Sequence, residues 1–215
     1  MSLSVTGLTV GAFEENCYLL TDAMGVESVL IDPGAEPDRI IAEVERSGTT
    51  LQAIWLTHAH LDHVGAIAGL NRKWDVPVYL HPLDQQLYAM ASRQAAMYGV
   101  PFEQPPAAER TLGEGDVVRV GSLEFTVMHA PGHSPGHVVF HGHGVAFVGD
   151  CLFAGSIGRT DLPMSNPRDL AASLDRIVAL GDAMVAYPGH GPVTSLGTEA
   201  KTNPFLTGVA RIVGA

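Results

Sequence analysis

Thr57-His58-Ala59-His60-Leu61-Asp62-His63 is the stretch of this 215-residue chain that decides its fold. It follows an apolar run at residues 53–56 that predicts a strand, and it leads into a helical pattern at residues 64–74. His58 and His60 are two residues apart, so in extended backbone they face the same way and can bind one ion. Asp62 and His63 follow where the chain turns into the helix. The pattern therefore predicts metal ligands at the end of a strand.

Three further apolar strands run into candidate ligands. Residues 123–128 lead to His133, residues 145–148 lead to Asp150, and residues 184–187 lead to His190. Ligands at strand ends converge on one sheet edge, where a rigid core positions the loops that carry chemistry. Residues 53–58 and 125–133 are each an apolar strand that enters a His-bearing loop. This likeness predicts two similar halves that face one another.

Seven side chains supply enough ligands for two metal ions that share a carboxylate. The predicted ligands are His58, His60 and His133 for one ion, Asp62, His63 and His190 for the other, and Asp150 as the bridge. Imidazole and carboxylate without thiolate suit zinc, iron or manganese, and zinc is the expected metal. Two such ions roughly 3.5–4 Å apart lower the pKa of a shared water to about 7 and polarise a scissile carbonyl. Asp62 is predicted to orient the resulting hydroxide and to take its proton.

Two plainer interpretations of the histidines are less favoured. A single His is more often a satisfied core or surface residue, but seven candidate ligands exceed what packing requires. A structural zinc site is usually closed, four-coordinate and rich in cysteine, and the chain has only Cys17 and Cys151. A metal-dependent hydrolase is the leading interpretation.

The composition bounds the fold and the partners. The chain is 46% hydrophobic, which predicts one core and a single domain over residues 1–215. Twelve basic and 23 acidic residues give a net charge of −11, so we expect no nucleic-acid or membrane partner and instead a small-molecule substrate. The sequence has no export signal, no membrane span and too few cysteines for a disulfide framework, which predicts a cytoplasmic protein with two free thiols.

Strands dominate the predicted elements, with helices between some of them. The strands are residues 3–10, 17–21, 28–31, 53–56, 117–120, 123–128, 137–140, 145–148 and 184–187, and the helices are residues 37–47, 64–74, 82–98 and 167–180. The fold class is α+β or layered α/β. Residues 99–109, with three prolines, predict a linker between two halves of one core. Residues 88–98 either line a substrate pocket or, as we favour, pack the core.

Four side chains outside the ligand set are candidates for supporting roles. Asp32 and His137 are predicted to support the ligands from behind, because metal-bound histidines commonly give their other N–H to a carboxylate. A turn aspartate is an equal alternative for Asp32. Arg159 either contacts substrate or pairs with Asp161. Lys201 either meets a substrate carboxylate or remains a solvated surface lysine.

The His-x-His-x-Asp-His cluster, followed by a lone His, an Asp and a last His, resembles the metallo-β-lactamase superfamily over nearly the whole chain. The resemblance implies a four-layer αββα sandwich with mixed sheets and the metals at one edge. Asp150 looks like the bridging carboxylate of the glyoxalase II branch rather than the cysteine ligand of many β-lactamases. Neighbouring residues that leave a strand point to opposite sides, so we expect Cys151 to point away from the metals.

Three stretches are similar to the short bacterial glyoxalase II-like hydrolases. They are residues 152–161, Gly189-His190-Gly191-Pro192 and Thr202-Asn203-Pro204-Phe205. This resemblance implies hydrolysis of a hydroxyacylglutathione, such as S-lactoylglutathione, to the hydroxy acid and the free thiol. The 25 residues after His190 are too few for the helical C-terminal domain that helps to hold glutathione in long members. The identity of the thiol carrier therefore stays open.

Two other functions are alternatives to the hydrolase. A persulfide dioxygenase of the same superfamily uses one iron held by two histidines and an aspartate, which His58, His133 and Asp150 could supply. The complete second ligand set favours the hydrolase. A metal-holding module without turnover is the other alternative, and the intact Asp62 argues against it. The sequence leaves the oligomeric state open.

Overall fold

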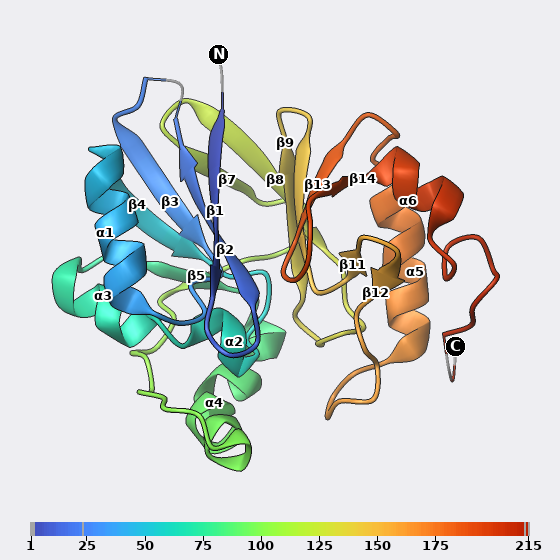
Figure 1. Ribbon diagram of the computed structural model, residues 1–215, viewed down its shortest axis with the longest axis horizontal. Coiled ribbons are helices and arrows are strands. Elements are labelled where there is room, and N and C mark those ends of the chain that lie inside the picture. Colours follow the sequence, from blue (N-terminus) through green and yellow to red (C-terminus); the bar gives the residue numbers. More distant parts are fainter. Residues whose placement is uncertain (1–2, 23, 213, 215) are drawn as a thin grey trace.

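Two six-stranded sheets pack face to face in the computed structural model, which describes residues 3–22, 24–212 and 214. Helices cover the outer face of each sheet, so the layers run helix, sheet, sheet, helix across the molecule (Figure 1). This arrangement confirms the predicted four-layer sandwich with mixed sheets.

The first sheet is built from the N-terminal half of the chain. Its strands, in spatial order, are β1 (Ser4–Val10), β2 (Glu15–Thr21), β3 (Glu27–Ile31), β4 (Thr50–Trp55), β5 (Val78–Leu80) and β6 (Arg110–Thr111). The first three strands are antiparallel, and β3 to β6 are parallel. Its helices are α1 (Pro37–Ser47), α2 (Leu61–Val64), α3 (Ile67–Lys73), the 3₁₀ turn η1 (Pro82–Asp84) and α4 (Gln85–Tyr98).

The second sheet follows the order β14-β13-β10-β9-β8-β7. Its strands are β7 (Val117–Val120), β8 (Leu123–His129), β9 (Val138–Gly142), β10 (Val145–Gly149), β13 (Val185–Pro188) and β14 (Thr194–Ser195). Helices α5 (Pro167–Val178) and α6 (Leu196–Thr202) cover its outer face (Figure 1). A small hairpin of β11 (Leu152–Phe153) and β12 (Ser156–Ile157) projects beside the second sheet.

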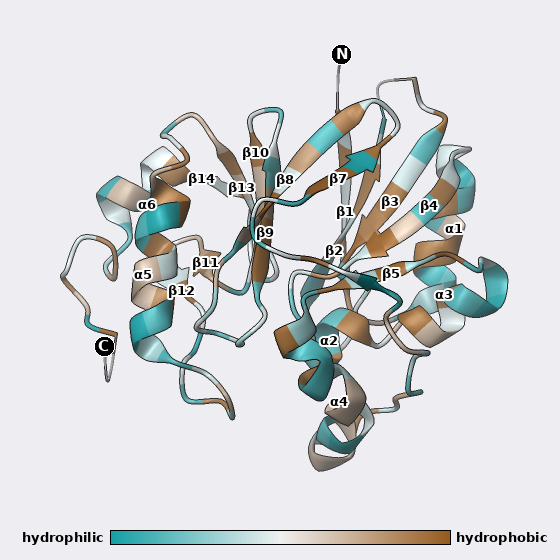
Figure 2. Cartoon of the chain, turned by 180° about the vertical axis from the view of Figure 1, so that it is seen from behind, coloured by the Kyte–Doolittle hydropathy of each residue, from teal (hydrophilic) through white to brown (hydrophobic). Residues whose placement is uncertain are grey.

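Three clusters of buried apolar side chains fill the three interfaces between the four layers. Strand β3 shows how one strand serves two of them, because successive side chains point to opposite faces of a sheet. Leu30 packs toward the first helical layer, whereas Val29 and Ile31 pack between the sheets. The apolar colouring of both sheets in Figure 2 follows from this double burial.

All nine predicted strands are present, with ends that differ from the prediction by at most three residues. The helix predicted over residues 64–74 is instead two short helices, α2 and α3, separated by Gly65 and Ala66. The elements that the pattern missed are β5, β6, β11, β12, β14 and α6. Strands of two or three residues have no room for a periodic apolar signature, so sequence pattern cannot reveal them.

The segment at residues 99–109 is irregular, as predicted, but it does not join the two halves. It runs from α4 to β6, and β6 pairs with β5 in the first sheet. The chain crosses to the second sheet only after β6. The prediction placed the crossing too early because β6 is two exposed polar residues with no apolar signal.

Cys17 and Cys151 are free thiols, and both are fully buried. Within the described ranges, no helix combines the length and the apolar character needed to cross a membrane.

Candidate metal centre

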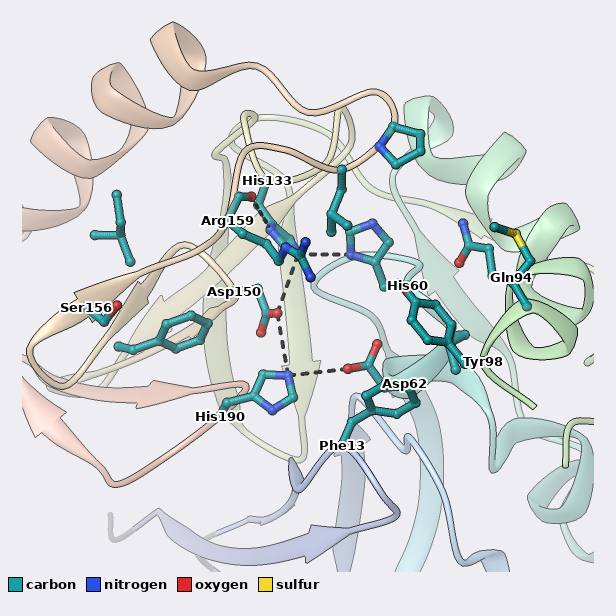
Figure 3. A pocket seen from close by; sticks show the side chains of 16 residues that line it. Phe13, His60, Asp62, Gln94, Tyr98, His133, Asp150, Ser156, Arg159 and His190 are labelled. Carbon is teal, nitrogen blue, oxygen red and sulfur yellow. Dashed lines mark hydrogen bonds and ion pairs between the residues drawn. The ribbon is translucent and has the colours of Figure 1, made fainter. Parts of the chain in front are cut away.

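Loops from both sheets bring the predicted ligands to one edge of the sandwich. Figure 3 shows His60, Asp62, His133, Asp150 and His190 among them. The first sheet supplies the loop after β4 and the start of α2, and the second sheet supplies the loops after β8, β10 and β13. These loops carry His58, His60, Asp62 and His63 on the first side, and His133, Asp150 and His190 on the second. Neither sheet has a complete site, so the packing of the two halves creates it.

The first cluster consists of His58, His60 and His133, whose ligand atoms lie within 4.8 Å of one another. His60 Nδ1 is 2.9 Å from His133 Nε2. Burial, together with the neighbouring His63, lowers the pKa of His58 well below its ordinary value. Burial and the nearby His133 lower the pKa of His60 to about 3. Both rings are therefore neutral at pH 7, which is the form that binds a metal.

Asp62, His63 and His190 form the second cluster, again within 4.8 Å of one another. His190 Nε2 is 3.4 Å from Asp62 Oδ2. Burial alone would raise the pKa of Asp62, but the hydrogen bond from His190 and the charge of His63 outweigh it and the pKa is lowered. Asp62 is thus an anion beside the other two ligands.

Asp150 lies between the two clusters, as a bridging ligand should. Its Oδ1 is 3.4 Å from His63 Nε2, and its Oδ2 is 3.4 Å from His133 Nε2 and 3.6 Å from His190 Nε2. Burial would raise the pKa of this carboxyl, but His63 above all, followed by His133 and His190, holds it below its ordinary value. The carboxylate therefore contacts ligands of both clusters in its charged form.

Among the described residues, three buried atoms that face the clusters have no hydrogen-bond partner. They are His58 Nε2, His63 Nε2 and Asp150 Oδ1; His63 Nδ1, on the side of Asp32, has none either. A buried polar atom without a partner is costly, and metal ions at the two clusters would satisfy all three. Gly189 leaves space beside them, since a Cβ on that residue would lie 2.2 Å from Asp150 Oδ1. The donor set fits two divalent ions, and the edge is a candidate binuclear His/Asp metal site.

Side chains behind the ligands fix how the rings present their nitrogens. Asp32 accepts hydrogen bonds from Thr57 N–H at 2.7 Å and Thr57 Oγ1 at 2.6 Å, and its Oδ2 is 3.1 Å from His63 Nδ1. His137 Nε2 accepts a hydrogen bond from the Asp150 N–H at 3.1 Å. These contacts are those expected of groups that orient metal ligands.

The backbone carbonyl of Arg159 orients His133, a predicted ligand from the second sheet, in a comparable way. His133 Nδ1–H donates to this oxygen at 2.9 Å, which leaves Nε2 facing the cluster.

Cys151, the residue after Asp150, points in the opposite direction from the predicted ligands. Its Sγ lies 3.4 Å from the carbonyl oxygen of Ala130, inside the core between the second sheet and its helices. Cys151 thus points away from the ligands, on the side opposite Asp150.

Sequence analysis missed the side chains by which the first sheet holds the His190 loop. Asn16 Nδ2 donates to the carbonyl oxygens of Pro188 at 3.2 Å and Gly191 at 2.8 Å, and Tyr18 OH donates to the Pro188 oxygen at 2.7 Å. Glu15 is 1% exposed with its Oε1 3.9 Å from His63 Nδ1, and burial raises its pKa well above the ordinary value. The signal available in the sequence was the pair of polar residues, Glu15 and Asn16, directly before the apolar run of β2.

A cavity of about 450 Å³ opens onto the ligands, a volume suited to a small molecule. Its remaining wall is mostly apolar and includes Phe13, Met97, Tyr98, Phe153, Ile157 and Leu162. The end of α4 thus lines the pocket, while Leu87, Tyr88, Ala91 and Ala95 of the same helix are buried. Both interpretations of residues 88–98 hold, one for each face of the helix.

Among the described residues that line this cavity, Arg159 is the one lysine or arginine. Its guanidinium makes two hydrogen bonds of 2.8 Å to Asp161, and its side chain is 60% exposed. Lys201 lies on α6, 3.4 Å from Asp182, and is not part of the cavity wall. The structure brings Arg159, but not Lys201, to the ligands.

Comparison with known proteins agrees with this geometry. Residues 10–190 match the Metallo-beta-lactamase superfamily. The chain is 36% identical to the hydroxyacylglutathione hydrolase GloC of Haemophilus influenzae, with 95% of this chain and 98% of GloC covered. It resembles the crystal structure of TTHA1623 in a di-iron-bound form, with a TM-score of 0.87, 48% identity, and coverage of 94% of this chain and 100% of the other.

A further similar structure is BLEG-1 B3 metallo-beta-lactamase, with a TM-score of 0.89, 35% identity, and coverage of 95% of this chain and 100% of the other. The family match covers most of both sheets and every predicted ligand of the two clusters. The chain belongs to the metallo-beta-lactamase superfamily.

Proposed function

We propose that the chain is a binuclear metal-dependent thioesterase of glyoxalase II type. Its substrate would be S-lactoylglutathione or a related hydroxyacyl thioester, which it would split into the hydroxy acid and the thiol. The observation that carries the proposal is the position of Asp150 between two three-ligand clusters at the floor of the cavity. The similarity to a relative named hydroxyacylglutathione hydrolase supports the choice of substrate class.

When bound, two divalent ions would supply an activated water and would polarise the thioester carbonyl. We expect zinc in both positions, with iron or manganese as alternatives. The di-iron form of TTHA1623 supports iron as one of these. His58, His60 and His133 would hold one ion, and Asp62, His63 and His190 the other, with Asp150 shared between them.

Asp62 is the residue to which we assign the proton transfer. Its side chain is 18% exposed and lines the cavity, so it can reach both the second cluster and an incoming water. The water oxygen forms a bond to the carbonyl carbon and gives its proton to the Asp62 carboxylate. The carbon–sulfur bond then breaks, and the proton passes from Asp62 to the leaving thiolate.

The apolar wall would hold the substrate against this floor. Phe13 and Tyr98 meet edge to face, with ring centroids 5.6 Å apart, and they bring the β1–β2 turn against the end of α4. The rings leave an apolar surface for the methylene and acyl carbons of the substrate. We expect the partner to be a small molecule rather than a nucleic acid or a membrane, in keeping with the charge of −11.

Hydrolysis of S-lactoylglutathione by zinc- and iron-loaded protein tests the proposal. We expect turnover that is lost in Asp62→Ala and kept in Asp38→Ala, because Asp38 is exposed in the first turn of α1. Metal content is measured on each variant, so that a lost proton acceptor and a lost ion are told apart. No hydrolysis by protein that holds two metals would overturn the choice of substrate.

Two comparison substrates separate the alternatives. Oxygen uptake with glutathione persulfide by protein that holds one iron would support the dioxygenase instead. The protein could also open the lactam ring of a chromogenic cephalosporin faster than it hydrolyses the thioester. That result would support a β-lactamase activity, as in the B3 metallo-beta-lactamase that the chain resembles.

A further inference from the structure

Asp84 is a fully buried carboxylate at the end of η1, outside the predicted ligand and support residues. Its Oδ2 accepts hydrogen bonds from the Ala59 N–H at 3.0 Å and from Ser134 Oγ at 2.7 Å. Its Oδ1 accepts one from the Gly136 N–H at 2.5 Å. Three neutral donors thus hold the Asp84 carboxyl group, and burial outweighs them and raises its pKa.

The donors to Asp84 lie in the loops that carry the ligands of the first cluster. Ala59 lies between the ligands His58 and His60 in the loop that follows β4, and Ser134 directly follows the ligand His133 in the loop after β8. The two loops extend from different sheets. Asp84 therefore joins, through one side chain, the two loops that must meet to form the first cluster.

The backbone of the β8–β9 loop lies so close to Asp84 that Gly136 has no room for a side chain. A Cβ on Gly136 would lie 2.6 Å from the Asp84 N and 2.8 Å from its Oδ1, so only glycine allows the β8–β9 loop to approach this closely. No such contact joins Asp84 to Asp62, His63 or His190 among the hydrogen bonds of the described residues. The link is specific to the first cluster.

We propose that Asp84 is a positioning residue that sets the spacing of the His58–His60 pair and His133, and thereby the metal affinity of the first cluster alone. Groups that orient metal ligands typically change metal affinity by about 10–100-fold when they are removed. Asparagine at this position would keep the shape of the side chain but turn an N–H toward donors that need an acceptor. A general loss of stability would weaken both clusters, whereas a positioning role weakens only one.

The test measures metal affinity, which does not depend on which thioester, if any, the protein hydrolyses. Zinc is titrated against a chromophoric chelator in two backgrounds that each keep one cluster: His190→Ala for the first and His60→Ala for the second. We expect Asp84→Asn to weaken zinc binding by about 10-fold or more in the His190→Ala background and by less than about threefold in the other.

Asp22→Asn is the matched control. Asp22 is also a mostly buried carboxylate that accepts backbone hydrogen bonds, from Val26 at 2.8 Å and Glu27 at 2.9 Å, but it sits in the β2–β3 turn. It should leave both affinities unchanged. Cobalt(II) spectra of the two backgrounds provide a second readout, with a change expected only where the first cluster is retained.

Ser134→Ala keeps the proposal testable if Asp84→Asn does not fold. This variant removes one of the three hydrogen bonds and should weaken the first cluster by about threefold to tenfold. Unchanged affinity in Ser134→Ala, or equal weakening of both clusters by Asp84→Asn, would overturn the assignment.

Discussion

His58 and His63, two of the seven predicted ligands, are fully buried beneath the cavity and do not line it. Met97 and Tyr98, on the outer wall of the same cavity, are 80% and 56% exposed. We call these two regions the floor, formed by the seven ligands, and the rim, formed by residues 94–98 and 153–163. The floor is held by hydrogen bonds from both sheets, whereas the rim is held by aromatic contacts, a surface ion pair and the hydrogen bond of Asn203 to the β11–β12 hairpin.

The difference assigns separate tasks to the two regions. A metal site works only if its ligands are placed before the metal and substrate arrive, which requires rigid support. A wall that selects substrates can vary without disturbing that placement. Changes in the floor should therefore alter metal content and turnover together, and changes in the rim should alter substrate affinity alone.

The largest effect is expected for Asp150→Asn. This carboxylate contacts both clusters. Removal of a group that supports a ligand typically costs ~10–100-fold, and we expect Asp150→Asn to reduce the rate of thioester hydrolysis by more than that. Mass spectrometry of metals should show fewer than two ions per chain. A variant with two ions and normal turnover would show that the floor does not depend on a bridge.

His60 is expected to make the stability of the metal-free floor depend on pH. Burial and His133 lower the pKa of His60 to about 3, whereas a histidine in an unfolded chain titrates near ~6.5. Between these values the unfolded chain carries a proton on His60 that the folded chain does not, so the contribution of His60 to the free energy of unfolding falls as the pH is lowered. The raised pKa values of His63 and His190 act in the opposite direction, so the His60 contribution is taken from the difference between the wild-type protein and a His60 variant. Urea unfolding of metal-free protein at about pH 7, 6 and 5 measures this slope. His60→Gln should give a shallower slope, and equal slopes would contradict the assignment.

A smaller effect is expected where the rim is anchored. Asn203 is fully buried, and its Nδ2 donates to the Ser156 oxygen and to Glu199, both at 2.9 Å, which ties α6 to the β11–β12 hairpin. Asn203→Ala should cost about 1–3 kcal/mol of stability because it removes the side-chain donor of the buried Ser156 oxygen and one of the two hydrogen bonds to Glu199 Oε2. Thermal unfolding, KM and metal content are measured together. Raised KM with two metals retained is the expected result, and lost metal would show that floor and rim are coupled.

The smallest effect is expected for Asp161→Asn. The Arg159–Asp161 pair is exposed, so its loss should change stability by less than about 1 kcal/mol. Freed from Asp161, Arg159 could pair with an anionic substrate and lower KM for S-lactoylglutathione by about twofold to threefold, which initial-rate kinetics would detect. Arg159→Gln is the matched control and should raise KM. No change in either variant would remove Arg159 from substrate recognition.

The sequence predicted the floor more fully than its supports. Predicted ligands such as His133 and His190 stand directly after apolar strands, so local pattern and spacing were enough to predict that these side chains meet. Asp84 could not be found that way, because its partners Ala59 and Ser134 lie 25 and 50 residues away and come from different sheets. Its role depends on tertiary packing.

The same reason explains the other differences. The strand β6 has two exposed residues and pairs only because β5 lies beside it, so the crossing between the halves was placed too early. Lys201 follows His190 closely in sequence, yet α6 directs it to Asp182. Proximity along the chain did not predict proximity in the fold.

The central claim is that seven side chains hold two metal ions that share Asp150. Metal stoichiometry of the zinc-reconstituted protein and of its His190→Ala variant, measured by mass spectrometry on intact folded chains, tests this most directly. We predict two ions per chain in the wild-type protein and one in the variant. A single ion in the wild-type protein, or two ions in both, would contradict the account.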